Sequence, residues 1–289
     1  MKPLCLALSI TLFSLLAPAQ NSVPAGTCVY QKLPVDNLST PSAINDVGAI
    51  VGSVFSRADS TTHAFLLFNG KITIFRFPGS EFSTASSINN HSQIVGTTFF
   101  TVDRDIKGYV VREGAFHLIV VPNSEGNDAA DISDEGDIVG NLTTKDGVPK
   151  GYLLHNGTFH IFRFPGSAET HVTGINRDGI IIGNYRSADV NSPIHGFMVK
   201  NGNFTTLDFP GAQFTFPSKI NNEGQIIGFY EGHGLSHGFA FEKGKFRELN
   251  DPPDSQDNAP TGLNNHGKIV TVRQFPFTKS FIADCHAGF

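Results

Sequence analysis

One short motif, an isoleucine or leucine followed by asparagine or serine, returns at a nearly constant interval along this chain. The steps between successive copies are 44, 44, 43, 45 and 43 residues. The apolar residue that begins each copy is its anchor, and the anchors are Ile44, Ile88, Ile132, Ile175, Ile220 and Leu263. A repeat of this length, built from several short strands, is typical of propeller blades and other repeat arrays. The sequence therefore predicts six copies of one unit, which we number repeats 1 to 6.

Repeat 4 shows how one copy is built. Its short apolar runs at 180–185 and 195–200 are bounded by the turn residues 177–179 and by Asn201-Gly202. This punctuation is typical of strands and turns, and Asn-Gly is a strong hairpin signal because both residues tolerate positive φ. We therefore predict an all-β fold, a six-bladed β-propeller with four strands in each blade.

The last repeat is incomplete, because it ends after its third strand at 281–283. The segment 29–34, near the other end of the chain, matches the fourth-strand pattern of 72–78. We predict that this N-terminal strand completes the last blade and closes the ring, which would remove exposed sheet edges. The same alignment places Cys28 and Cys285 on the two sides of one hairpin and predicts a disulfide between them.

A second repeated element opens the third strand of each copy. It reads His-Ala-Phe, Lys-Gly-Tyr or His-Gly-Phe at 63–65, 107–109, 150–152, 195–197 and 237–239. Together with the upstream Ile-Asn-x-x-Gly-x-Ile-Val-Gly element, it resembles the bacterial extracellular repeats of the HAF family. The resemblance covers essentially the whole mature chain, with Ser133 in place of asparagine and Ser92 in place of glycine as the main departures. It implies secretion and a repeated β architecture, but no established activity.

Residues 1–19 have the features of a secretory signal peptide: Lys2, an apolar run at 4–16, and small residues at 17–19. The run is too short to span a bilayer, and no later segment is apolar for long enough. We therefore predict a secreted or periplasmic protein without a membrane span, in which residues 20–289 form a single propeller domain. Such a compartment permits disulfides.

The charge balance bears on the partner. The formal net charge is −5, and the sequence contains no basic run. Nucleic acids and anionic membranes attract clustered cations, so neither is expected as a partner. We expect a monomer that binds an extracellular glycan or protein.

Local catalytic signatures do not appear in the sequence. It has no nucleophile elbow, no zinc-protease helix motif and no phosphate-binding glycine loop. His63, His195 and His237 occupy a position at which other repeats have lysine. The segment 131–136 loosely resembles the start of a calcium loop, but the twelfth position of that loop would be Leu142, where glutamate is needed. We therefore predict no metal site and no cofactor.

Strand order places the loops of variable length on one face of the propeller and the regular turns on the other. Variable loops on a rigid scaffold are the usual place for recognition. The leading hypothesis is a non-enzymatic propeller that binds a glycan, a cell-wall component or a protein through this face. The residues expected there are Arg57, Asp59, Arg104, Asp105, His171, Arg186, Asp189 and His233.

Two other functions remain open. An extracellular hydrolase or polysaccharide lyase would need acid and base groups from different blades to converge in the central funnel. The candidates for such a site are Asp105, Asp128, His171, Asp189 and His233. A structural or self-associating surface protein is the third possibility. The 26 phenylalanines could stack on sugars, but their alternation along strands favours packing between neighbouring blades.

Overall fold

The structure is a computed structural model, and it describes residues 25–26, 28–36, 38–101, 105–189, 192–232, 234–273 and 278–285. Every regular element in these ranges is a β-strand, so the all-β prediction is confirmed. Consistent with this, the described residues contain no helix of the length and apolarity that crossing a membrane requires. The predicted signal peptide, Arg104 and His233 lie outside the described residues.

Repeats 1 to 3 each form a separate antiparallel sheet in which the strands follow one another in chain order. The strands of repeat 1 are β3 (Ser39–Ile44), β4 (Ile50–Ser56), β5 (Thr61–Phe68) and β6 (Lys71–Phe75). Those of repeat 2 are β7 (Phe82–Ile88), β8 (Ile94–Phe100), β9 (Asp105–Arg112) and β10 (Ala115–Ile119). Repeat 3 has an interrupted first strand and contains β11 (Ser124–Asn127), β12 (Asp131–Ile132), β13 (Ile138–Thr144), β14 (Pro149–His155) and β15 (Thr158–Phe162).

Repeats 4 and 5 have the same internal order and are joined by one parallel contact between Ile194 and Phe214. Repeat 4 contains β16 (Ser167–Ile175), β17 (Ile181–Ser187), β18 (Ile194–Lys200) and β19 (Asn203–Thr206). Repeat 5 contains β20 (Phe214–Ile220), β21 (Ile226–Gly232), β22 (Leu235–Glu242) and β23 (Lys245–Leu249), with β1 (Ala25–Gly26) parallel to its outer edge. Repeat 6 contains β24 (Ala259–Leu263), β25 (Lys268–Arg273) and β26 (Lys279–Asp284).

The N-terminal strand supplies the fourth strand of the last sheet. β2 (Val29–Lys32) runs antiparallel to β26, as the sequence predicts. A disulfide joins Cys28 to Cys285 across 257 residues, so this prediction is confirmed. Repeats 6 and 1 are also in direct contact, because the Thr261 hydroxyl donates to the Pro41 carbonyl oxygen at 2.9 Å.

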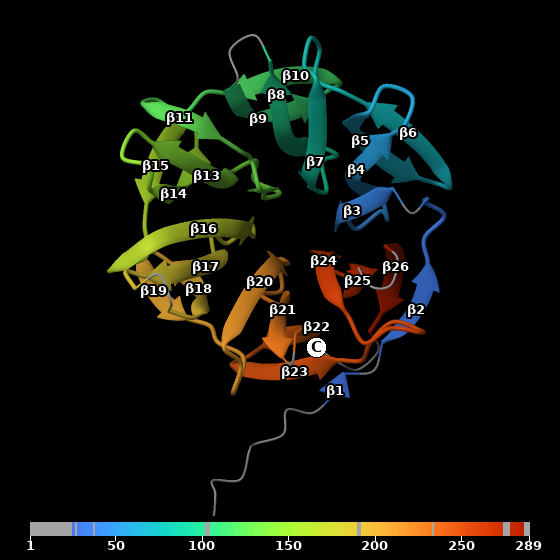
Figure 1. Ribbon diagram of the computed structural model, residues 1–289, viewed down its shortest axis with the longest axis vertical. Coiled ribbons are helices and arrows are strands. Elements are labelled where there is room, and N and C mark those ends of the chain that lie inside the picture. Colours follow the sequence, from blue (N-terminus) through green and yellow to red (C-terminus); the bar gives the residue numbers. More distant parts are fainter. Residues whose placement is uncertain are drawn as a thin grey trace, which may run out of the picture.

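The sheets stand around a common centre (Figure 1). The first strands of the repeats, such as β3, β7, β16, β20 and β24, lie nearest this centre, whereas β10, β15, β19, β23 and β2 lie at the periphery. The core fills the spaces between neighbouring sheets. Its largest members are the aromatic residues that end the repeated third-strand triplets, all at most 1% exposed: Phe65, Tyr109, Tyr152, Phe197 and Phe239.

A glycine eight residues after the anchor makes this core possible in repeats 1 to 5. A Cβ atom at Gly96 would lie 1.9 Å from the Thr84 carbonyl oxygen, and one at Gly183 would lie 2.0 Å from that of His171. The buried aromatic side chain of the third strand is also close: the Tyr109 hydroxyl oxygen would lie 2.9 Å from a Cβ at Gly96, and the Phe197 ring 2.9 Å from one at Gly183. The glycine therefore marks a close approach of the first two strands, as expected from its place inside a strand.

Candidate functional site

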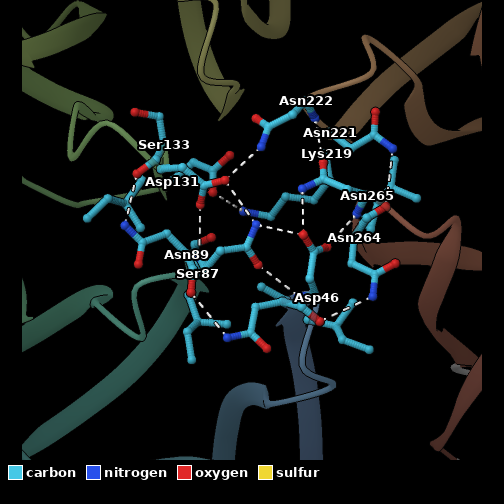
Figure 2. A pocket seen from close by; sticks show the side chains of 18 of the residues that line it. Asp46, Ser87, Asn89, Asp131, Ser133, Lys219, Asn221, Asn222, Asn264 and Asn265 are labelled. Carbon is cyan, nitrogen blue, oxygen red and sulfur yellow. Dashed lines mark hydrogen bonds and ion pairs between the residues drawn. The ribbon is translucent and has the colours of Figure 1, made fainter.

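The repeated asparagine links each repeat to the next near the centre. In repeat 1, the Asn45 side chain accepts a bond from its own turn through Oδ1 and donates from Nδ2 to the Asn89 carbonyl oxygen at 3.1 Å. In four other repeats the side-chain amide likewise donates to a backbone carbonyl oxygen of another repeat, at 2.9–3.2 Å: Asn89 to Ser133, Asn176 to Asn221, Asn221 to Asn264, and Asn264 to Asn45. The last of these joins repeat 6 to repeat 1. Figure 2 shows several of these residues converging on the centre.

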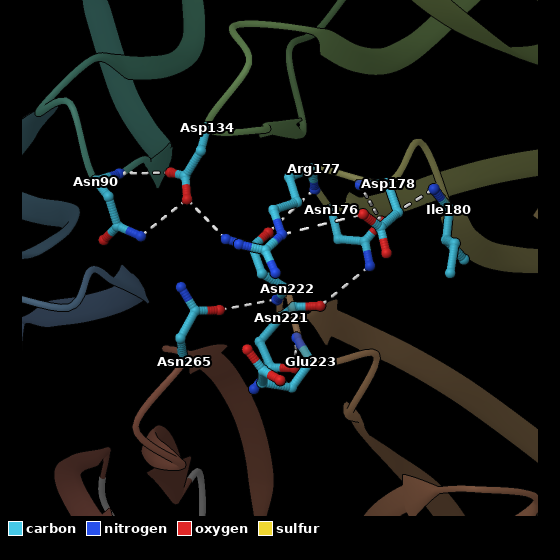
Figure 3. A network of polar contacts seen from close by, with 10 residues as sticks. All are labelled: Asn90, Asp134, Asn176, Arg177, Asp178, Ile180, Asn221, Asn222, Glu223 and Asn265. Atoms are coloured by element: carbon cyan, nitrogen blue, oxygen red, sulfur yellow. Dashed lines mark hydrogen bonds and ion pairs between the residues drawn. The ribbon is translucent and has the colours of Figure 1, made fainter.

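The residue after each asparagine adds a second set of bonds. The Asp46 backbone N–H donates to Asn90 Oδ1 at 2.8 Å, and four other turns repeat this contact at 2.8–3.0 Å. The side-chain amides of Asn90 and Asn222 both donate to Asp134 Oδ2, at 2.9 and 2.7 Å (Figure 3). These polar groups surround a space of about 60 Å³ at the centre. The central channel between the sheets is therefore nearly filled by side chains at the end where the turns after the anchors lie.

Repeat 3 departs from this scheme, because Ser133 has no amide to donate to repeat 4. Its neighbour Asp131 provides another link: Asp131 Oδ2 accepts from the Ile175 N–H, and Oδ1 accepts from Lys219 Nζ, both at 2.9 Å. Asp131 and Lys219 are 4% and 7% exposed, so they form a buried ion pair across the centre. At this position, one residue before the anchor, the other repeats have small residues: Ala43, Ser87, Gly174 and Gly262.

The opposite side of the channel opens into a funnel of about 420 Å³. Lys219 lines both this funnel and the smaller space, so the ion pair lies at the boundary between them. The funnel wall is mainly apolar, with a few polar side chains, and includes Pro41, Thr97, Asp128, Val172, Asn184, Phe216, Pro217, Phe229 and Pro260. A concave, mostly apolar surface with a few polar groups is the usual composition of a small-ligand site.

The funnel has chemically different sides. In each repeat, the residue four positions before the anchor lies opposite the residue nine positions after it, on the neighbouring strand. These pairs are Thr40–Ser53, Thr84–Thr97, Asp128–Asn141, His171–Asn184, Phe216–Phe229 and Ala259–Val272. Residues directly opposite each other share one face of a sheet. Of these residues, Thr40, Thr97, Asp128, Asn184, Phe216 and Phe229 line the funnel. Repeats 3 to 5 therefore contribute a carboxylate, an amide and an aromatic pair to its wall, where repeats 1 and 2 contribute threonines.

Phe216 and Phe229 form a half-buried aromatic platform on the funnel wall. Their ring centroids are 4.8 Å apart and their planes differ by 20°. Both residues line the funnel. The platform therefore presents aromatic surface to whatever occupies the funnel.

Asp128 is the carboxylate of this group and is held by Asn141. Its Oδ1 accepts from the Asn141 N–H at 2.7 Å, and its Oδ2 accepts from Asn141 Nδ2 at 3.1 Å. Burial raises the pKa of Asp128. Hydrogen bonds from Asn141 and the electrostatic effect of the nearby His171 partly offset this rise. Asn141 also bonds the backbone of Val172 in both directions, which fixes the carboxylate between repeats 3 and 4.

Of the predicted catalytic residues, the structure brings Asp128 and His171 close enough to interact electrostatically. Asp105 instead forms an ion pair with Lys107 on its own strand, with 2.6 Å between Oδ2 and Nζ. Asp189 is exposed in the loop after β17. Among the described residues, no group of three or more histidine, cysteine, aspartate or glutamate side chains is placed to hold a metal ion.

The predicted ligand-face residues that the structure describes are exposed or half-exposed: Arg57, Asp59 and Asp189 lie in loops, whereas Asp105, His171 and Arg186 lie on strands. Arg57 lies in the β4–β5 connection, and Arg186 Nε pairs with Glu169 Oε1 at 2.8 Å. Asp59 pairs with His63 at 2.8 Å, and hydrogen bonds from Ser56 and then His63 lower the pKa of Asp59. The described residues of this set belong to several repeats and are not gathered in one cluster.

Sequence reasoning missed the buried ion pair and the aromatic platform. From sequence, the stretch that contains Asp131 is weighed only as a calcium loop, and the phenylalanines are assigned to packing between blades rather than to sugar stacking. A signal was present in both cases. Lys219 and Asp131 are opposite charges at a position that is otherwise small, and Phe216 stands where other repeats have threonine, alanine, aspartate or histidine.

Comparison with known proteins identifies the fold. No family model matches the sequence, and no curated protein matches it. The propeller domain of the Trilobed protease from Pyrococcus furiosus is similar in structure, with a TM-score of 0.58, 9% identity, and 86% of this chain and 82% of that chain covered. The chain has a β-propeller fold.

Two other solved structures are similar over most of their length. AofleA from Arthrobotrys oligospora gives a TM-score of 0.55 at 12% identity, covering 89% of this chain and 86% of that one. The Aleuria aurantia lectin, solved as a mutant in complex with Fucα1-6GlcNAc, gives 0.52 at 11% identity, covering 82% and 88%. At such identities the similarity establishes the fold alone.

Proposed function

We propose that this chain is a secreted, non-enzymatic, six-bladed β-propeller of the HAF type that binds a glycan, a cell-wall component or a protein through its variable-loop face. Each repeat is one four-stranded blade, β2 completes the sixth blade and closes the ring, and residues 1–19 are removed on export. The mature protein, residues 20–289, acts as a monomer in an extracytoplasmic compartment.

The funnel is the observation that carries this proposal. It opens on the side of the variable loops, has a volume of about 420 Å³, and combines the Phe216–Phe229 platform with the Asp128 carboxylate. The opposite end of the channel is filled by the asparagine network and the Lys219–Asp131 pair. A ligand therefore has one face from which to enter. A lectin with a propeller fold that binds a fucosylated disaccharide supports a glycan as the ligand class.

A hydrolase or polysaccharide lyase with its site in the funnel is the second candidate. It is favoured by Asp128, whose raised pKa suits a general acid or base, and by the adjacent His171. It is weakened by the placement of Asp105, which pairs with Lys107 instead of joining Asp128. Two convergent acid–base groups would have to be Asp128 and His171 themselves.

One experiment separates the two candidates. The purified mature protein is applied to an array of immobilised polysaccharides, and both retention and release of soluble product are measured. A binding protein is retained and releases nothing. An enzyme releases product with turnover, and Asp128→Asn abolishes this release. Absence of both retention and release on the polysaccharides would refute the glycan assignment.

A further inference from the structure

We propose that the wall of the funnel formed by repeats 3 to 5 is a subsite for one uncharged pyranose unit of a glycan. This inference rests on the proposed glycan-binding function and adds to it the position of the site and the class of sugar. Three properties of the described residues lead to it: an aromatic surface, a directed hydrogen-bond acceptor, and the absence of an unpaired cation among the residues lining this wall.

The aromatic platform fits one face of a sugar ring. A pyranose presents a patch of C–H groups on one face, and such a patch packs against the negative face of an aromatic ring. Phe216 and Phe229 come from adjacent strands β20 and β21 and stack on each other, so the pair offers a sugar one outer ring face, backed by the second ring. Both residues are half-buried, so part of the stacked pair stays accessible.

The polar groups on the same wall can bind the hydroxyls at the edge of that ring. Asp128 Oδ2 accepts one bond from Asn141 at 3.1 Å, and a carboxylate oxygen has capacity for a further donor. Asn184 lines the funnel in the next repeat, and its amide can both donate and accept. Because Asn141 fixes Asp128 through backbone and side-chain bonds, the acceptor is preorganised for a ligand hydroxyl.

The charges of the funnel favour a neutral sugar over an acidic one. Lys219 is the ammonium group that lines the funnel, and it is neutralised by Asp131 at 2.9 Å. Asp128 adds negative charge to the wall, so a uronic acid would meet a like charge there. Arg186, the predicted ligand-face arginine of repeat 4, forms an ion pair with Glu169. A like-charge contact of this kind is a common means of excluding the wrong ligand.

The test compares two variants that each remove one ring of a stacked cross-strand pair. Phe229→Ala disrupts the platform. Phe99→Ala is the matched control, because Phe99 stacks on Phe82 at a centroid distance of 5.5 Å, is half-buried like Phe229, and does not line the funnel. The probes are immobilised glucan, mannan and xylan as neutral polysaccharides, with polygalacturonan as the acidic one. Thermal unfolding of each variant confirms that it is folded.

We expect the native protein to be retained on at least one neutral polysaccharide and not on polygalacturonan. Phe229→Ala should weaken that retention by roughly two- to tenfold, and Asp128→Asn by roughly ten- to a hundredfold, whereas Phe99→Ala should leave it unchanged. Retention on a neutral polysaccharide that Phe229→Ala and Phe99→Ala affect equally would overturn the subsite while leaving glycan binding intact. Stronger retention on polygalacturonan would overturn the preference for an uncharged sugar. Failure of every polysaccharide to retain the native protein would refute the glycan assignment on which the subsite rests.

Discussion

Replacing Lys219 with methionine tests whether the ion pair across the channel holds the repeats together. The Lys219 ammonium contacts Asp131 Oδ1 at 2.9 Å and the Ala130 carbonyl oxygen at 3.3 Å. Methionine keeps most of the side-chain volume but removes the charge. Asp131 is 4% exposed and would keep a single hydrogen bond, from the Ile175 N–H at 2.9 Å.

The expected cost follows from leaving this carboxylate unpaired. Removing one partner of a buried ion pair costs about 3–5 kcal/mol, because the remaining charge is neither solvated nor compensated. For a domain of this size, each kcal/mol lowers the melting temperature by about 2–4 °C. Lys219→Met should therefore lower the melting temperature, measured by circular dichroism on the mature protein at neutral pH, by about 6–20 °C.

Two further variants make the measurement specific. Lys268→Met removes an exposed lysine whose ammonium lies 3.6 Å from Asp284, and exposed pairs contribute at most about 1 kcal/mol, so its melting temperature should stay near that of the native protein. Asp131→Asn combined with Lys219→Met removes both charges but keeps an oxygen for the Ile175 N–H, and it should be more stable than Lys219→Met alone. If Lys219→Met melts like Lys268→Met, or if the double variant is the least stable, the reasoning is wrong.

Three other outcomes are expected. Replacing Cys28 and Cys285 together by serine should lower the free energy of unfolding in denaturant by on the order of 5 kcal/mol, because the bond spans 257 residues; a variant with the same denaturation midpoint as the native protein would contradict this. Ser133→Asn supplies the missing amide toward Asn176 and should raise stability by about 1 kcal/mol, seen as a higher melting temperature; a decrease would show that the turn of repeat 3 cannot adopt the shared geometry. Polysaccharide retention should fall as the pH is lowered through the raised pKa of Asp128, because protonation removes the charged acceptor, and the fall should begin above the usual aspartate pKa near 4. The same pH profile in Asp128→Asn would argue against this cause.

Much of the scaffold was predictable because each repeat obeys the same local rules. The Asn-Gly hairpins are an example: Asn69, Asn156 and Asn201 have φ between 47° and 50°, the conformation that makes asparagine favourable there. The pairing of β2 with β26 and the disulfide followed from comparing the incomplete last repeat with a complete one. These inferences needed only the repeat length and the strand pattern.

The links between repeats were harder to predict, because they depend on contacts between residues one repeat apart. The Ile-Asn motif predicts a turn, and the Asn45 Oδ1 atom does accept from Ala49 N within that turn. The outward bond of the same side chain to Asn89 depends on the distance between neighbouring turns, which no local rule supplies. A sequence separation of 44 residues for this bond, equal to the repeat length, becomes meaningful only once the repeats are placed around one centre.

The candidate site lies where the repeats differ from one another, and these differences concentrate in repeats 3 to 5. Ser133 breaks the asparagine network, Asp131 and Lys219 replace small residues at the centre, and Asp128 and Phe216 replace residues that are small in repeats 1, 2 and 6. Positions that keep the repeated residue serve the scaffold, because every copy needs the same turn and the same close strand approach. Where adjacent repeats both differ from the repeated residue, the side chains are not needed for the turn or for the close approach of the strands. In a protein built from equivalent units, a ligand that occupies the centre must meet unequal walls to bind in one orientation, and the unequal wall here is the one formed by repeats 3 to 5.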